Sequence, residues 1–97
     1  MFGLDWADAA RETYASLKFD AFKKKQYKAV KGAIKLLAEN PRYPSLQTHE
    51  FMSLKGPKGE KVFEAYAEQN TPKAYRILWY YGSARGIITI FMITPHP

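Results

Sequence analysis

Three short runs rich in β-branched and aromatic residues fill the second half of the sequence and constrain its fold more than any other feature. The runs span 61–68, 75–81 and 87–93, and the connections 70–73 and 82–86 between them contain glycine, proline or asparagine. Residues of these kinds favour strands, and short connections favour antiparallel neighbours. The last run, IITIFMI, carries no charge and suits the most buried strand. The pattern predicts an antiparallel meander, with a further short strand at 47–54.

Two amphipathic helical patterns precede these runs. The first extends from Asp5 to Leu17, with Asp5 placed to cap the helix. The second begins after Asp20 and ends before Pro41. Its predicted apolar face is formed by Phe22, Tyr27, Val30, Ile34 and Leu37. The short connection between the patterns predicts a helical hairpin, so we expect an α+β fold in which this hairpin packs on one face of a three- to four-stranded, mostly antiparallel sheet.

The chain has 97 residues, a net charge of +6 and no cysteine. This length suits a single domain over 1–97, and the charge favours an anionic partner. The lack of cysteine fits a reducing compartment, and the first residues, with early acids and no long apolar run, predict neither a secretory signal nor a membrane span. We expect a cytoplasmic protein that does not bind membranes.

The second helical pattern also carries lysines at 24, 28, 31 and 35, which share one helical face. Such a ridge is either a solvated face or a contact surface for phosphates or an acidic partner protein. Gly32 in the same pattern is unfavourable in a helix interior, which suggests close packing at that position.

Arg76 is the outstanding charged residue of the predicted sheet, because its neighbours in YRILWYY are apolar or aromatic. A guanidinium in such surroundings needs an anionic partner. Two partners are open at this stage: a ligand phosphate, or Glu64 across the neighbouring strand.

The two histidines have different prospects. His96 follows the last predicted strand and suits proton transfer near neutral pH, although a frayed terminus is the alternative. His49 is isolated in the sequence and receives no role. Without cysteine, these two residues do not form a metal-binding motif, so we expect no metal and no cofactor.

The order of motifs resembles the central pattern of RelE/ParE-superfamily toxins, which belong to bacterial toxin–antitoxin systems. The resemblance rests on LKG at 54–56, Gly59, the strand VFEAY, the strand YRILWY, the final apolar strand and the histidine near the end. Phe2-Gly3-Leu4 is too short for the initial strand usual in that family, no C-terminal helix follows, and the full basic set of its best-known nuclease is not reproduced.

The resemblance implies a metal-independent ribonuclease that cuts mRNA on the ribosome and that a cognate antitoxin inhibits, with no small-molecule substrate. Arg76 matches the arginine that contacts the scissile phosphate in ribosome-dependent members, Lys55 the lysine of LKG, and His96 a general acid or base. By charge and ring type, further RNA-binding candidates are Lys58, Lys61, Arg85, Tyr66 and Tyr80. The alternatives are a non-catalytic protein that poisons DNA gyrase, or a degenerate homologue that only binds RNA or its antitoxin.

Overall fold

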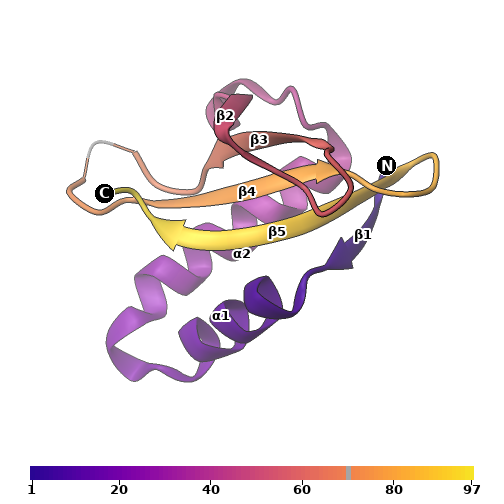
Figure 1. Ribbon diagram of the computed structural model, residues 1–97. Helices are drawn as coiled ribbons and strands as arrows, with labels where there is room; N and C mark the ends of the chain where they lie inside the picture. The colour runs from indigo at the N-terminus through magenta and orange to yellow at the C-terminus, as the bar shows by residue number, and fades with distance from the viewer. Residues whose placement is uncertain (70) are drawn as a thin grey trace.

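In the computed structural model, which describes residues 1–69 and 71–97, two α-helices pack on one face of a five-stranded sheet (Figure 1). The order of the strands across the sheet is β1-β5-β4-β3-β2. The elements are β1 (Gly3–Trp6), α1 (Asp8–Phe19), α2 (Lys24–Glu39), β2 (His49–Lys55), β3 (Lys61–Tyr66), β4 (Tyr75–Tyr81) and β5 (Ile87–Pro95). The predicted α+β class and helical layer are confirmed. The predicted three to four strands are too few.

The meander predicted from the second half of the sequence is confirmed. Strands β2 to β5 pair in sequence order, and each pair is antiparallel. Register shifts interrupt the β2–β3 pair between Glu50 and Lys55, and the β4–β5 pair between Leu78 and Trp79. Of the predicted connection 70–73, residue 70 lies outside the described residues.

The fifth strand comes from the first residues of the chain, where the sequence predicted none. Strand β1 pairs in parallel with β5, from Gly3 opposite Ile87 to Trp6 opposite Ile90. The helical spacing that includes Trp6 led the predicted helix to begin at Asp5, whereas α1 begins at Asp8. A strand of four residues is too short to show a detectable alternation. Its backbone hydrogen bonds also depend on β5, which is far away in the sequence.

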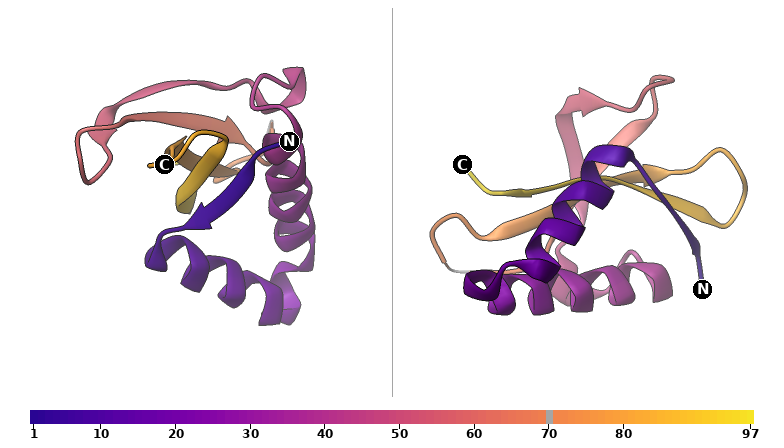
Figure 2. Two further views of the ribbon diagram at one scale, coloured as in Figure 1. Left: turned by 90° about the vertical axis from the view of Figure 1, so that its right-hand side faces the viewer. Right: turned by 90° about the horizontal axis from the view of Figure 1, so that it is seen from below.

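The helices form the predicted hairpin (Figure 2), with one clear departure. Val30, Ile34 and Leu37 are buried as expected, but Phe22 is 96% exposed. Phe22 lies in the short 3₁₀ turn Ala21–Lys23, which Asp20 caps by accepting a hydrogen bond from the Phe22 N–H at 2.9 Å. The helical period therefore does not extend to Phe22, since α2 begins only at Lys24.

Gly32 does not mark a close contact between elements. It is exposed on α2, and a Cβ atom added there would meet no atom within 4 Å among the described residues. The expectation of close packing at this residue is wrong.

The two faces of the sheet carry different cores. The inner face, which the helices cover, holds the main core, with Ile77 and Trp79 from β4 and Ile88 and Ile90 from β5 packed near Leu37. The outer face holds a smaller cluster of Val62, Leu78 and Tyr80, against which side chains of β2 and β5 pack. Burying a large apolar side chain fully stabilises the fold by about 1.5–3 kcal/mol. Most of this stabilisation therefore comes from the inner face.

Among the described residues, neither helix combines the length and the apolar character that a membrane-spanning segment needs.

Candidate functional site

Arg76 forms an ion pair with Glu64 on the outer face of the sheet. Its Nη1 donates a hydrogen bond to Oε2 of Glu64 at 2.7 Å, and the two side chains are only 12% and 4% exposed. The guanidinium also lies over the ring of Phe51, with Cζ 5.0 Å from the ring centroid. Of the two anionic partners considered for Arg76, Glu64 is present in the structure. The proposed contact of Arg76 with a phosphate stays a prediction.

His49 joins the same cluster, although nothing in its sequence context suggested a partner. It lies opposite Glu64 in the register of β2 and β3, and its Nε2 is 2.7 Å from Oε1 of Glu64. Its Nδ1 is 2.9 Å from the backbone oxygen of Gln47. Glu64 thus bridges His49 and Arg76, and both ring nitrogens of His49 already have oxygen partners. The register of three strands, β2, β3 and β4, brings these residues together.

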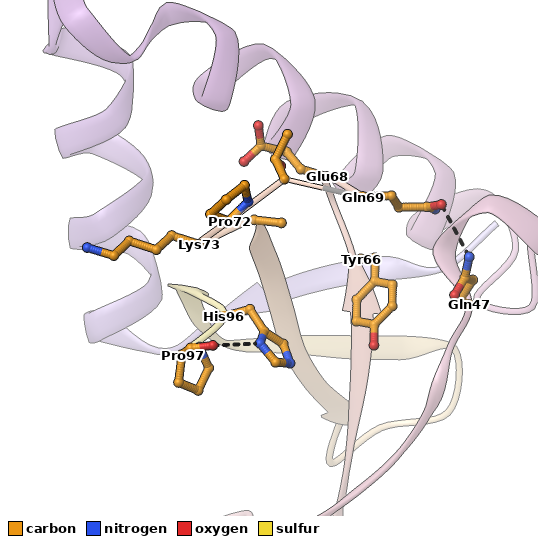
Figure 3. Close-up of a pocket in the computed structure, with 10 residues that line it drawn as sticks. Gln47, Tyr66, Glu68, Gln69, Pro72, Lys73, His96 and Pro97 are labelled. Atoms are coloured by element: carbon orange, nitrogen blue, oxygen red, sulfur yellow. Dashed lines mark hydrogen bonds between the residues drawn. The ribbon is translucent and has the colours of Figure 1, made fainter.

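A pocket of about 330 Å³ lies at the end of the sheet that carries Arg76, Glu64 and His49. Tyr66 and His96 both line it, and Figure 3 shows their rings on the same side of the pocket, with Lys73 extending away from them. Tyr66 lies directly opposite Arg76 in the register of β3 and β4 and follows Glu64 by two residues on β3, so the pocket adjoins the Arg76–Glu64 pair.

His96 is anchored although it lies close to the end of the chain. Its backbone N–H donates to the backbone oxygen of Ala74 at 2.8 Å, and its Nδ1 is 3.1 Å from the backbone oxygen of Pro97. Within the described residues, its Nε2 has no hydrogen-bond partner. His96 therefore presents one ring nitrogen for proton transfer, in contrast to His49.

The remaining predicted residues lie at the opposite end of the sheet. Lys55, at the end of β2, lies opposite Lys61, at the start of β3. Nζ of Lys55 is 3.8 Å from Oε2 of Glu50. Lys58 and Arg85 are exposed in the two connections at this end. Lys61 and Tyr66 are five positions apart along β3, which corresponds to about 17 Å at the usual rise of a strand. The structure therefore does not place Lys55 beside Arg76 and His96.

Tyr80 is packed among apolar side chains on the outer face of the sheet. It is 9% exposed and belongs to the outer-face cluster, with its ring centroid 5.5 Å from that of Phe91 in an edge-on arrangement. The geometry agrees with the alternative that Tyr80 is a core aromatic residue. Tyr66 is only half-buried and keeps a pocket-facing ring, so it is the better candidate for base stacking.

Among the described residues, no three histidine, aspartate or glutamate side chains gather in a way that would hold a metal ion.

Comparison with solved structures finds a similar fold in bacterial toxins and in an archaeal RelE–RelB complex. A YoeB/ParE toxin from Agrobacterium tumefaciens matches with a TM-score of 0.69 and 10% identity, covering 98% of this chain and 99% of that chain. The archaeal RelE–RelB complex from Pyrococcus horikoshii matches with a TM-score of 0.66 and 15% identity, covering 97% of this chain and 93% of that chain. The intact Escherichia coli RelBE toxin–antitoxin complex matches with a TM-score of 0.63 and 10% identity, covering 100% of this chain and 99% of that chain.

The chain therefore has the RelE/ParE-like toxin fold along essentially its whole length. No protein-family model matches the sequence, and no curated protein matches it either. At these identities the structural likeness defines the fold, and the chemistry has to be argued from the residues themselves.

Proposed function

We propose that this protein is the toxin of a toxin–antitoxin pair and that it cleaves mRNA on the ribosome without a metal. The main support is that His96 and Tyr66 line one pocket immediately beside Arg76. His96, which follows β5, and Tyr66, at the end of β3, face this pocket. Arg76 lies beside it on β4, with its guanidinium bonded to Glu64.

The reaction proposed is attack of an RNA 2′-hydroxyl on the adjacent phosphate. It needs a proton acceptor, stabilisation of the developing negative charge and a proton donor for the departing 5′-oxygen. His96 suits one proton transfer through its unpaired Nε2. Tyr66 can hold a base by stacking. Arg76 stabilises the charge, and its bond to Glu64 fixes the orientation of the guanidinium.

Lys55, Lys58, Lys61 and Arg85 can bind the RNA backbone rather than the reacting phosphate. They lie at the far end of the sheet, so they suit contacts with neighbouring nucleotides or ribosomal RNA. Loss of one of these charges should weaken binding to all RNA sequences similarly and leave the chemical step unchanged.

A second candidate function is poisoning of DNA gyrase through protein contact, without catalysis. The observation that favours it is the occupied guanidinium of Arg76, which Glu64 neutralises and which is only 12% exposed. An arginine held in this way is a structural residue in the simplest interpretation.

The proposed partners are an antitoxin and the ribosome with its mRNA. Two of the similar structures are complexes of RelE with RelB. The net charge of +6 favours an acidic antitoxin for this chain. The proposed location is the cytoplasm, where ribosomes are.

The experiment is induction of the protein in Escherichia coli, followed by mapping of mRNA 5′ ends. New 5′ ends inside reading frames, lost in a His96→Gln variant expressed at the same level, would support the ribonuclease. Growth arrest with intact messages and a DNA-damage response would support the gyrase alternative. Normal growth with confirmed soluble protein would contradict both.

A further inference from the structure

The connection between α1 and α2 carries an unusual surface that the proposed site does not use. We name it the aromatic–basic tip, formed by Lys18, Phe19, Phe22, Lys23, Lys24, Lys25 and Lys28, all of which are exposed. Phe19 is 81% and Phe22 is 96% exposed. Isolated exposed apolar residues are common, but two phenylalanines among five lysines on one short connection indicate a binding surface.

The charges of the tip are almost unopposed along the chain. Asp20 is the one acid between residues 18 and 28, and its side chain already accepts a hydrogen bond from the N–H of Phe22. Lys18 lies near Phe19, with Nζ 5.7 Å from the ring centroid. Lysines and exposed phenylalanines are therefore close neighbours along this segment, and such a combination can bind phosphates and bases together.

The tip lies at the same end of the sheet as the pocket. Nζ of Lys23 is 3.4 Å from the hydroxyl of Tyr75, which begins β4 and is the neighbour of Arg76. Tyr75 is opposite Pro95, the residue before His96. Figure 1 shows the helix connection and the end of β5 on the same side of the molecule. A strand of RNA that leaves the pocket can therefore reach the tip.

We propose that the aromatic–basic tip is a second binding surface for single-stranded RNA, with bases stacked on Phe19 and Phe22 and phosphates held by the lysines. The proposal rests on the proposed function for its choice of RNA as the ligand. Pairing of two tips from separate copies would bring ten lysines together, which disfavours self-association. The buried faces of both helices are already packed in the core, so the tip itself offers a membrane two apolar side chains, Phe19 and Phe22.

The test measures binding of a fluorescein-labelled 12-nucleotide RNA with 2′-O-methyl groups, which lack the hydroxyl needed for cleavage. The variant is Phe22→Ala/Lys24→Gln. The matched control is Arg42→Gln/Tyr43→Ala, which removes one cation and one partly exposed ring at the other end of α2. Fluorescence anisotropy is measured over a series of salt concentrations.

The tip variant should bind RNA about tenfold more weakly, mostly through loss of stacking on Phe22. The plot of log affinity against log salt concentration should become shallower. The magnitude of its negative slope should decrease by about 0.7, the value for one lost phosphate contact on a single strand. The control should retain the affinity of the unmodified protein within about twofold. Because the substituted tip residues are exposed, thermal unfolding should not change.

Three results would overturn the proposal. One is unchanged RNA affinity in the tip variant. Another is binding to phosphatidylserine vesicles that the tip variant loses while RNA affinity is kept, which would assign the tip to membranes. The third is a concentration-dependent dimer that Phe22→Ala abolishes.

Failure of the proposed ribonuclease is distinguishable from failure at the tip. Cleavage in cells depends on His96, whereas binding of the uncleavable RNA should be insensitive to His96→Gln if the tip provides it. If the tip binds RNA but the protein cleaves no mRNA, the proposal for the tip is supported and only the proposed ribonuclease activity is contradicted.

Discussion

The inner and outer faces of the sheet differ in what their side chains are used for. The inner face is covered by the helices, and its strand residues Ile77, Trp79, Ile88 and Ile90 are at most 1% exposed. The outer face divides along the strands: Val62, Leu78 and Tyr80 form a small apolar cluster, and the polar cluster of Glu64, Arg76 and His49 adjoins it. The same alternating strands thus supply stability on one face and polar chemistry on the other.

The difference shows why the two faces should respond differently to substitution. An apolar core loses stability in proportion to the volume removed. A buried charge cluster loses stability when one partner is removed and regains it when both are neutralised. These expectations can be tested in order of decreasing effect.

Trp79→Ala should have the largest effect, a loss of about 3–5 kcal/mol in the free energy of unfolding, because it empties the centre of the inner core. Urea unfolding measured by circular dichroism provides the value. Met52→Ala is the control, since Met52 is 78% exposed and its loss should cost less than about 0.5 kcal/mol. A similar small loss for Trp79→Ala would show that the inner face does not dominate stability.

Arg76→Ala should destabilise the protein by about 3 kcal/mol, because among the described residues it leaves the buried carboxylate of Glu64 with His49 as its one side-chain partner. If Arg76 were instead held ready for a ligand phosphate, the other partner considered from the sequence, its loss would cost no more than about 1 kcal/mol. The double variant Glu64→Gln/Arg76→Gln should recover part of the loss. No recovery in urea unfolding would mean that the pair is not a coupled unit.

His96→Gln should lower RNA cleavage by about 100-fold or more, the usual effect of losing an acid–base group, while stability changes by less than about 0.5 kcal/mol. Cleavage of a reporter mRNA on purified ribosomes gives the rate. His49→Gln is the matched comparison: it should reduce stability, and activity should follow the amount of folded protein. Equal rate losses in folded samples of both variants would contradict this division of roles.

Tyr14 gives the helical layer a pH dependence at the alkaline end. Burial, and secondarily the hydrogen bond and charge interaction with Tyr27, raise the pKa of Tyr14 from 10.0 to about 12. The folded state favours the neutral phenol, so this contribution is complete below pH 10 and is lost as pH rises towards 12. Its size should be about 1 kcal/mol after allowance for solvent screening. Melting temperatures between pH 9 and 12 should fall less steeply for Tyr14→Phe.

Gly32→Ala should give the smallest effect, a gain of about 0.5–1 kcal/mol, because the position is exposed within α2 and open space surrounds the added methyl group. Thermal unfolding should show a higher midpoint. A loss of stability would instead support the close packing at Gly32 that the sequence predicted.

Part of the candidate site follows from the sequence, because one residue and its neighbours carry the signal. Arg76 is conspicuous among apolar residues in YRILWYY, and Glu64 was one of its two expected partners. Lys24 and Lys28 of the aromatic–basic tip belong to the lysine ridge that the sequence predicted. The partner of His49 and the exposure of Phe22 did not emerge from the sequence, because His49 has no periodic pattern and the helical spacing assigned Phe22 to the apolar face of the second helix.

Local patterns in the sequence determine the helical hairpin, the antiparallel meander and the buried face of α2, because propensity and periodicity act between residues that are close in the chain. The exposure of Phe22 is also a local effect, since it follows from the 3₁₀ turn that Asp20 caps. Tertiary structure alone decides two other features. Strand β1 exists because β5 supplies its hydrogen bonds. The register of β2, β3 and β4 joins His49, Glu64 and Arg76 and separates Lys55 from them. Both features depend on contacts between distant segments, which a single sequence does not encode in its local spacing.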